Sequence, residues 1–471
     1  MLLLRDDRAT AATAALQREH TALVRAVHTG ATDLDAVHSA KLLRALDDAR
    51  KSPMYQGRIP DLAGEVNARQ VLDEILPSLP FLGKKELSEF GQGAFTRGLD
   101  EFLHYYESSG TTGNPAAAPK ALDDLLPNTI NLGEMWARLL RPKDIALILI
   151  NAPFAPAAYQ FEKVLEYLQV TSLRPWVDNI TGNYARVLRL TADLGVNVFV
   201  GPPSRLLEMV QFAYREKLPA PRFDRLLLMA EQTGPSFRRH LERLTGASAY
   251  VCSYGSSETG TPAVTCEHHQ LHLQPQSFVL ELEDDSGVRR VVDGSADRGR
   301  LVVTTLDLPS RPLLRYRTGD LVEIDDAPCP CGVRTQVLRT LGRAQDLVVL
   351  DRSGIRQNEL EAAVWEEPLP SAVVFNYMVV LRGKHVVVLV TYDGDEDGPW
   401  VRALADRLGA LFGDYQLSVR PVRALPPLAS LGQYLGWKLS RVLDLNDEEN
   451  WARLPSPIDT VVRQTLSEVA F

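Results

Sequence analysis

The sequence predicts an α/β fold, with a large N-terminal domain of mixed βαβ sheets plus a β-rich subdomain, and a small α+β C-terminal domain. Strand-like and helix-like runs alternate through the middle of the chain, as in parallel βαβ units. After Gly260 the runs become β-rich and are separated by Asp/Gly turns, which indicates an antiparallel subdomain. At 471 residues the chain is too long for one ordinary core, so at least two domains are expected.

The expected elements follow from periodicity. An amphipathic helix is expected over residues 11–28, with its stop at Gly30. The βαβ region has strands at 145–150, 196–200 and 226–229 and helices at 160–168 and 203–214. The β-rich subdomain has strands at 278–282, 301–306 and 321–324. The C-terminal domain has strands at 373–381, 385–392 and 418–423 and a helix at 399–412. We expect domains at 1–342 and 346–471, with the boundary at about 343–346.

The bulk composition excludes several function classes. The net charge of -9 and the pI near 5.6 disfavour binding to nucleic acid or to an anionic membrane, because both need a basic face. No apolar run approaches the roughly 20 residues that span a bilayer. The apolar start, residues 1–4, is too short for a signal peptide. A cytoplasmic protein is therefore expected.

A loop rich in hydroxyls and glycines suits phosphate binding. Its side chains and backbone offer donors to phosphate oxygens at Ser108, Ser109, Gly110, Thr111, Thr112 and Gly113. It is not a Walker A loop, because the Gly-Lys-Ser/Thr ending is missing. A polar surface turn has a similar composition.

Two further segments combine polar side chains with turns. Tyr254, Gly255, Ser256, Ser257 and Glu258 follow the strand-like run 247–252, and the carboxylate is a ligand type that suits Mg²⁺. Residues 316–320 place the carboxylate of Asp320 at an expected tight turn, where ribose hydroxyls can donate to it. Each segment, taken alone, also fits a structural turn.

In their order and separation these segments resemble the adenylate-forming superfamily of acyl-CoA synthetases, adenylation domains and luciferases, and within it the phenylacetate-CoA ligase-like branch. The resemblance covers about residues 50 to 445. The loop at 108–115 is similar to the family's phosphate loop, 253–260 to its adenine and magnesium motif, and 316–320 to its ribose motif. The stretch 229–231 resembles the Gly-Ala-Glu near adenine, and 341–346 resembles the motif that joins the two domains.

The resemblance implies a two-step reaction with ATP. A carboxylic acid attacks the α-phosphorus and releases pyrophosphate, and a nucleophile then displaces AMP. By resemblance, the residues that bind the nucleotide and Mg²⁺ are Ser109, Thr111 and Thr112 on the phosphates, Glu258 on Mg²⁺, Tyr254 and Glu231 near adenine, and Asp320 and Arg343 at the ribose. The family's small C-terminal domain is mobile and rotates about the hinge between the two steps.

The same resemblance identifies a catalytic lysine and an acyl pocket. The segment 436–442 is similar to the family's Gly-x-x-x-x-Arg-Val tail, and Lys438 stands where a lysine bridges the carboxylate and the α-phosphate. The alternative is a solvated loop lysine. Phe154, Tyr159 and Gly201 occupy places that line the acyl pocket in relatives, and the two aromatic rings suit an aryl or arylalkyl acid.

Cysteines and histidines gather in two short clusters. Cys266 precedes three histidines, and Cys329 and Cys331 follow about sixty residues later, a set typical of a closed tetrahedral zinc site. From the residues alone the fourth ligand stays open. The resemblance to branch members favours His272 over His269. The alternative is a set of reduced, buried cysteines.

The chain departs from the family pattern in ways that affect the second step. Ala116 replaces a hydroxyl after the phosphate loop, Gln345 stands at the hinge, and the following Gly-rich stretch is shortened to 353–356. The acceptor therefore stays open: coenzyme A, a carrier-protein pantetheine, or the amine of an amide-forming ligase. A non-catalytic binding homologue is a further alternative. The sequence leaves the oligomeric state open, a homodimer included.

Overall fold

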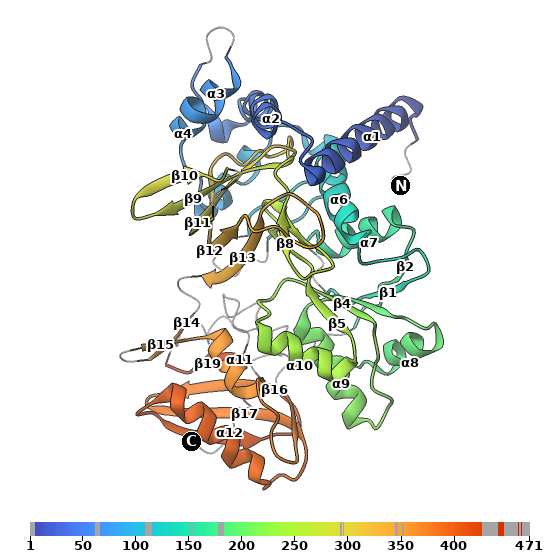
Figure 1. The fold of residues 1–471 in the computed structure, drawn as a ribbon, viewed down its shortest axis with the longest axis vertical. Helices are drawn as coiled ribbons and strands as arrows, with labels where there is room; N and C mark the ends of the chain where they lie inside the picture. The colour runs from blue at the N-terminus through green and yellow to red at the C-terminus, as the bar shows by residue number, and fades with distance from the viewer. Residues whose placement is uncertain are drawn as a thin grey trace. The chain divides into compact units, whose positions relative to one another are not determined.

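The computed structural model describes residues 5–61, 66–108, 115–151, 154–177, 183–292, 294, 296–343, 347–350, 353–425, 441–446, 460 and 463. Helices combine with a five-stranded sheet of order β2-β1-β3-β4-β5, an eight-stranded sheet of order β10-β9-β11-β12-β13-β8-β7-β6, and a four-stranded sheet of order β18-β17-β16-β19 (Figure 1). The predicted α/β class is confirmed.

The chain divides by its internal contacts into two compact units. Unit 1 comprises Met1–Asp144, Ala152–Ser172 and Val251–Ala344, and unit 2 comprises Ile145–Asn151, Leu173–Tyr250 and Gln345–Phe471. The C-terminal part thus shares a unit with the middle of the chain. The expected division at residues 343–346 and the mobility of the C-terminal domain stay predictions.

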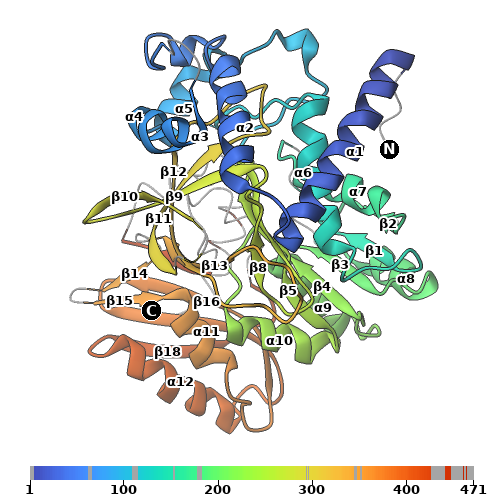
Figure 2. The same cartoon turned by 45° about the horizontal axis from the view of Figure 1, so that its top comes forward.

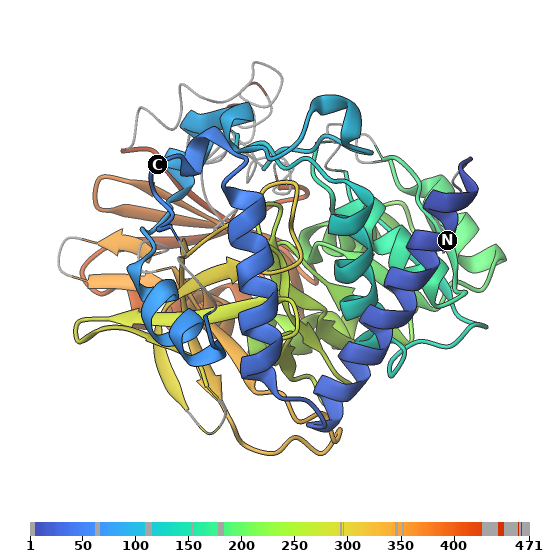
Figure 3. The ribbon, with the colours of Figure 1, turned by 90° about the horizontal axis from the view of Figure 1, so that it is seen from above.

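The helices of unit 1 begin with the expected N-terminal helix. The side chain of Asp6 accepts hydrogen bonds from two backbone N–H groups of the first turn, and Gly30, at φ +71°, ends the helix. This helix lies beside α6, and His20 contacts Asn131 across them at 2.9 Å (Figures 2 and 3). The helical elements of unit 1 are α1 (Asp7–Thr29), α2 (Leu34–Ala49), η1 (Pro53–Tyr55), α3 (Ala68–Gln70), η2 (Val71–Ile75), α4 (Leu76–Ser78), α5 (Lys84–Phe90), η3 (Gly91–Ala94), η4 (Leu99–Glu101), α6 (Leu122–Trp136) and α7 (Ala157–Tyr167).

The eight-stranded sheet is the predicted antiparallel subdomain. Its strands are β6 (Ser253–Ser256), β7 (Gly260–Thr265), β8 (Leu271–Leu273), β9 (Phe278–Asp284), β10 (Gly287–Arg290), β11 (Asp297–Thr305), β12 (Tyr316–Asp325) and β13 (Val337–Arg343). Their described pairs are antiparallel. Apolar side chains on one face form a core that includes Phe278, Leu301 and Val322.

The adenine and ribose motifs of this subdomain lie on strands, although a tight turn was expected at residues 316–320. Residues 253–256 form β6, which pairs with β7. Residues 316–320 lie inside β12 rather than in a tight turn, because a bulge absorbs the irregularity: the register with β11 shifts between Arg300 and Val302. Gly319, at φ +78°, permits the bulge, and the Thr318 hydroxyl donates to the Leu301 carbonyl oxygen at 2.9 Å.

Unit 2 contains the predicted parallel strands. The pairs β1–β3 and β3–β4 are parallel, in the register Leu147↔Phe199 and Phe199↔Leu226, and these strand residues are buried. Continuous apolar runs are expected where helices cover both faces of a sheet. The elements of this region are β1 (Ile145–Ile148), β2 (Thr171–Leu173), α8 (Ala185–Asp193), β3 (Val198–Gly201), α9 (Pro203–Arg215), β4 (Arg225–Leu228), α10 (Pro235–Thr245) and β5 (Ser248–Val251).

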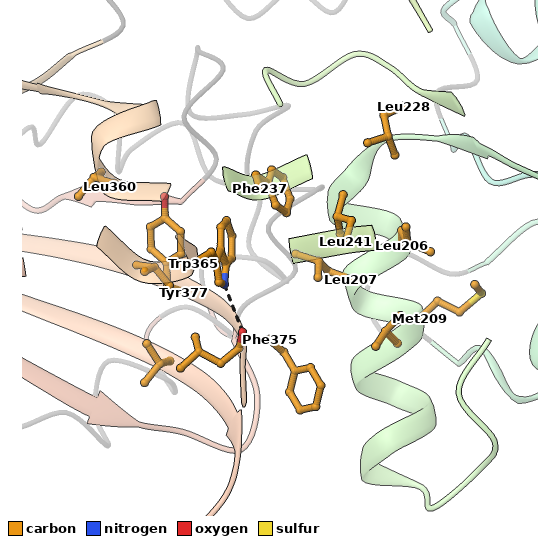
Figure 4. Packing of buried hydrophobic residues seen from close by; sticks show 14 of the residues in the cluster. Leu206, Leu207, Met209, Leu228, Phe237, Leu241, Leu360, Trp365, Phe375 and Tyr377 are labelled. Atoms are coloured by element: carbon orange, nitrogen blue, oxygen red, sulfur yellow. Dashed lines mark hydrogen bonds between the residues drawn. The ribbon is translucent and has the colours of Figure 1, made fainter. Parts of the chain in front are cut away.

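The C-terminal part of unit 2 contains the expected strands and helix. Its elements are β14 (Leu347–Leu350), β15 (Ser353–Arg356), α11 (Gln357–Trp365), β16 (Val373–Arg382), β17 (His385–Asp393), α12 (Pro399–Phe412), β18 (Gln416–Pro421) and β19 (Val442–Asp444). One apolar cluster joins this part to α9 and α10: Trp365 and Tyr377 lie near Phe237 and Leu241 (Figure 4). Among the described residues, no helix has both the length and the hydropathy needed to cross a membrane.

Candidate functional site

The base of the predicted phosphate loop is a closed hairpin in unit 1. Glu107 pairs with Ala117, and the backbone N–H of Ser108 donates to Ala116 at 2.9 Å. The Ser108 hydroxyl is buried and accepts a hydrogen bond from the N–H of Ala116 at 2.9 Å. The next five predicted phosphate-binding residues, Ser109, Gly110, Thr111, Thr112 and Gly113, lie outside the described residues.

The predicted adenine and ribose motifs meet in the eight-stranded sheet. The Tyr254 hydroxyl on β6 donates to a carboxylate oxygen of Asp320 on β12 at 2.7 Å. Asp320 also pairs through its backbone with Arg343 on β13. Three residues predicted to hold the nucleoside therefore come from three strands of one sheet, although sequence separates the first two by 66 positions.

The strand that carries Tyr254 turns tightly after it. A Cβ atom at Gly255 would lie 2.1 Å from the Gly260 carbonyl oxygen, so a side chain does not fit there. The Ser256 hydroxyl accepts a hydrogen bond from the N–H of Thr259 at 3.2 Å. Ser257 is half-buried in the same turn, next to Glu258. The turn fixes the backbone on both sides of the predicted Mg²⁺ ligand.

Glu258 is almost fully buried, with 4% of its surface exposed, and cations surround it. Lys84 Nζ lies 3.4 Å from its Oε1, and Arg311 Nη2 donates to its backbone carbonyl oxygen at 2.8 Å. Although burial favours the neutral form, Lys84 and Arg311 hold the pKa of this carboxyl below its ordinary value. Oε1 has no hydrogen-bond partner in the described part of the chain. A buried carboxylate with an unsatisfied oxygen suits a hard cation such as Mg²⁺.

Two predicted residues of unit 2 lie at the carboxyl ends of parallel strands. Glu231 follows β4, and its side chain binds the hydroxyl and the backbone N–H of Ser204 in the first turn of α9. Burial raises the pKa of Glu231. Gly201 ends β3, where a Cβ atom would lie 2.9 Å from the Leu149 carbonyl oxygen, so close strand packing accounts for this glycine.

The predicted acyl-pocket aromatics lie in unit 1. The Phe154 side chain is 68% exposed, and its carbonyl oxygen accepts a hydrogen bond from the N–H of Glu107 at 2.8 Å. Tyr159 is half-buried on α7, with its ring 4.2 Å from the ring of His104. Both residues lie near the hairpin of the phosphate loop. Their role in binding an acid stays a prediction.

The predicted catalytic Lys438 lies outside the described residues. Its neighbour Arg441 is described and is buried in unit 2. The Arg441 Nε donates to the Asn376 side chain at 2.9 Å, and the guanidinium lies 4.5 Å from the centre of the Phe237 ring. Arg441, three positions after the predicted lysine, is therefore fixed by its contacts.

The predicted metal ligands come together. The ligand atoms of Cys266, His272, Cys329 and Cys331 all lie within 4.8 Å of one another. Cys266 Sγ and Cys329 Sγ are 3.8 Å apart, which equals the spacing of about 3.8 Å expected for two thiolates on one tetrahedral Zn²⁺. His269, the alternative ligand, is not in this group.

The surroundings of the cluster also fit a metal. His272 Nδ1 contacts the Thr335 carbonyl oxygen at 2.9 Å, which orients Nε2 toward Cys331 Sγ at 3.2 Å. Backbone N–H groups of His268 and Val333 donate to two of the sulfurs at 3.3 Å. The donor set is that of a closed structural zinc site, with no position left for substrate.

The cations around Glu258 were not predicted from the sequence. Lys84, Lys120 and Arg311 come from three distant segments, and none belongs to a motif. Arg311 stands in a mixed stretch, Leu306 to Leu314, that also contains Asp307 and Ser310, so its charge gave no distinct signal.

No protein-family model matches the chain. Curated relatives match most of its length. The chain is 26% identical over 451 residues to a phenylacetate-coenzyme A ligase of Thermus thermophilus, covering 86% of this chain and 96% of the relative. It is 24% identical over 361 residues to the phenylacetate-coenzyme A ligase of Pseudomonas putida, covering 73% and 78%.

Solved structures share the fold. A 2-hydroxyisobutyryl-CoA ligase in the postadenylation state matches with a TM-score of 0.68 and 18% identity, over 91% of this chain and 92% of that one. The AtGH3.15 acyl acid amido synthetase, in complex with 2,4-DB, matches with a TM-score of 0.60 and 14% identity, over 98% and 97%. At these sequence identities, the similarity to the two solved structures shows the fold alone. That fold has a large N-terminal domain and a smaller C-terminal domain.

Proposed function

Since this chain belongs to the adenylate-forming superfamily, within its phenylacetate-CoA ligase-like branch, we propose that it is an ATP-dependent ligase that activates a carboxylic acid as an acyl-adenylate. The observation that carries the proposal is the meeting of Tyr254 and Asp320 at 2.7 Å in the sheet that also supplies the buried Glu258. A nucleoside-binding pair beside a cation-binding carboxylate is what adenylation requires.

The nucleotide is held at both ends. Asp320 accepts hydrogen bonds from the ribose hydroxyls, Arg343 lies at the ribose side, and Tyr254 stacks near the adenine. Glu231 contributes at the adenine. The loop from Ser108 to Gly113 grips the phosphates, with its base fixed by the Ser108–Ala116 bonds.

In the first step, a carboxylate oxygen of the acid attacks the α-phosphorus of ATP. A new P–O bond forms as the bond to the β-phosphate oxygen breaks, and the bonding electrons leave with pyrophosphate. Glu258 would hold Mg²⁺, and the bound ion would supply positive charge that stabilises the phosphates in the transition state. Lys438 orients the attacking carboxylate against the α-phosphate.

In the second step, the acyl group passes to a thiol, coenzyme A or a carrier-protein pantetheine, and AMP leaves. We favour the thiol because the two curated relatives, of which the chain covers 96% and 78%, are phenylacetate-coenzyme A ligases. An amine acceptor is the second candidate. The fold match to an acyl acid amido synthetase over 98% of this chain supports keeping it.

The acid is proposed to be aryl or arylalkyl. Phe154 and Tyr159 provide flat apolar surface beside the phosphate-loop hairpin. Phenylacetate is the first acid to test, since the curated relatives are phenylacetate-CoA ligases.

The decisive experiment is ATP–pyrophosphate exchange with a panel of aryl and aliphatic acids. We expect exchange with arylalkyl acids and a loss of at least about 100-fold in Lys438→Ala, as for removal of one charged transition-state contact. The matched control is Lys143→Ala, an exposed lysine that should leave exchange unchanged. Absence of exchange with every acid, despite ATP binding, would refute the proposal.

Product analysis separates the two acceptors. Incubation with acid, ATP and coenzyme A should give an acyl-thioester and AMP. Formation of an amide from an added amine, with no thioester under the same conditions, would replace the thiol proposal by the amine one.

The Cys266, His272, Cys329 and Cys331 cluster is proposed to hold one structural Zn²⁺. Metal analysis of freshly purified protein should give about one zinc per chain, and Cys331→Ser should lower both zinc content and thermal stability. Cys252→Ser is the matched control, because Cys252 is buried outside the cluster. Equal zinc content in both variants would overturn the assignment.

A further inference from the structure

Buried polar atoms without partners gather next to Glu258. Among the described residues of unit 1, the buried side-chain atoms without a hydrogen-bond partner include Glu258 Oε1, Ser310 Oγ, and Nε and Nη1 of Arg311. Arg311 is 1% exposed, yet among the described residues it makes one hydrogen bond, from Nη2 to the Glu258 carbonyl oxygen. Each buried polar group left unpaired costs about 1–3 kcal/mol, and more when charged. Arg311 therefore has two buried donors available to a ligand.

Two lysines add charge to the same place. Lys120 is buried on the returning arm of the phosphate-loop hairpin, where its backbone pairs with His104. Burial lowers the pKa of Lys120 to about 8, while Asp124 and Glu258 partly oppose this effect. Lys84 lies 3.4 Å from Glu258, and its side chain is 26% exposed, so the cluster reaches the surface there.

The charges in this cluster do not balance. The cations are Lys84, Lys120 and Arg311, and the carboxylates that face them are Glu258 and Asp124. One positive charge is left over before any Mg²⁺ binds. An unbalanced positive charge in a buried setting favours an anionic ligand, because few water molecules are available to screen it.

The donors also suit a phosphoryl group. Nε and Nη1 of Arg311 are fixed in a planar guanidinium and can donate to more than one oxygen of the same anion. Ser310 provides a hydroxyl beside them, held by its backbone N–H on Asp124 at 3.1 Å. On the hairpin, Lys120 is a buried cation that follows the buried residues Ala116, Ala117 and Ala118.

We propose that Arg311, Lys120 and Lys84 form a diphosphate-binding cluster beside Glu258, which takes the β- and γ-phosphates of ATP and the pyrophosphate released from it. The inference rests on the proposed function and deepens it. It also accounts for Ala116, where the family pattern carries a hydroxyl: the cations supply phosphate contacts that the loop lacks.

The test is calorimetric binding of MgATP, magnesium pyrophosphate and AMP to the full-length protein and its variants. Arg311→Gln and Lys120→Gln should each weaken ATP and pyrophosphate at least about 10-fold, as for loss of a charged hydrogen bond. AMP should bind within about twofold of wild type, since it lacks the β- and γ-phosphates. The control is Arg300→Gln, an exposed arginine on β11 that should change nothing.

Unchanged affinity for ATP and pyrophosphate in both variants would contradict the proposed diphosphate site. So would a loss of AMP affinity equal to the loss of ATP affinity. Because Arg311 is buried, its variant is first compared with wild type by thermal unfolding. If Arg311→Gln does not fold, the same measurements are made with Lys120→Gln and with the conservative Arg311→Lys. Arg311→Lys should retain part of the affinity for ATP and pyrophosphate.

Failure of the cluster and failure of the proposed function give different results. If pyrophosphate binds in an Arg311-dependent way but no acid supports exchange, the ligase proposal fails and the cluster stands. If exchange proceeds equally in wild type and both variants, the cluster is wrong and the ligase proposal stands.

Discussion

Two nearly inaccessible arginines, one in each unit, are satisfied in very different ways. Arg441 in unit 2 donates to Asn376 and lies over the rings of Phe237, Trp365 and Tyr377, while its buried Nη2 has no hydrogen-bond partner among the described residues. Its charge also lowers the pKa values of Glu231 and Glu361 against the effect of their burial. Arg311 in unit 1 has one hydrogen bond, to a backbone carbonyl oxygen, and two donors without partners in the described residues.

Both arginines carry the cost of removing a guanidinium from water. At Arg441, aromatic rings and carboxylates within the protein offset that cost, so the residue contributes to folding. At Arg311 the offset is incomplete, which fits a residue whose partner arrives with the ligand. The difference predicts that one arginine matters for stability and the other for binding.

The largest expected effect is on stability and comes from Arg441→Met. Removing the cation leaves Glu231 and Glu361 buried without their shared opposite charge, which should cost about 3–5 kcal/mol at pH 8. Chemical denaturation followed by tryptophan fluorescence should show a transition at lower denaturant concentration than in wild type. An unchanged midpoint would mean that Arg441 is no better satisfied than Arg311.

The second effect is a pH dependence from Glu361. Burial raises the pKa of Glu361 to about 7, from an ordinary value of 4.5. Between these values the folded state holds the proton and the unfolded state does not, so stability falls as pH rises from 4.5 to 7. The change is up to about 3 kcal/mol.

Glu361→Gln should remove this loss, giving a flatter plot of unfolding midpoint against pH between 5 and 7. The control is Glu359→Gln on the same helix, where the exposed side chain caps the helix and glutamine preserves that bond. A steeper fall in Glu361→Gln than in wild type would contradict the direction of the shift.

The third effect concerns the aromatic rings. Phe237→Leu should cost about 1–2 kcal/mol, partly through lost packing and partly through the cation–π contact with Arg441 at 4.5 Å. In the Arg441→Met background the same substitution should cost less. Phe412→Leu, at a buried ring on α12, provides the comparison, and its cost should be the same in both backgrounds.

The smallest expected stability effect is for Arg311→Met. Loss of one charged hydrogen bond is offset by removal of a buried, incompletely paired charge, so the unfolding free energy should change by less than about 1 kcal/mol. Thermal unfolding of the ligand-free protein measures it. A loss comparable with that of Arg441→Met would show that Arg311 is structural.

Much of the fold could be predicted because its signals are local. Buried parallel strands such as β3 read as apolar runs, and α1 ends at the glycine that its periodicity indicates. The β12 bulge was not predictable in the same way, since residues 316–320 read as a turn until their pairing with β11 is known.

The residues of the candidate site also differ in whether a local sequence pattern identifies them. Tyr254, Glu258 and Asp320 stand in contiguous motifs, so the sequence identified them, and the cysteine spacing identified the metal cluster. Lys84, Lys120 and Arg311 meet only because three segments separated by tens of residues pack together. No local sequence pattern indicates that these three side chains lie close together. A single charged residue in a sequence is most often exposed to solvent, so none of the three was singled out.

The position of β13 has a consequence for biosynthesis. This strand comes late in unit 1 yet pairs with both β12 and β8, so it joins β10-β9-β11-β12 to β8-β7-β6. Until residues 337–343 leave the ribosome, each of the two partial sheets exposes an unpaired edge that invites association with other nascent chains. A polypeptide truncated before Val337 should therefore aggregate, although it contains all the other strands of the sheet.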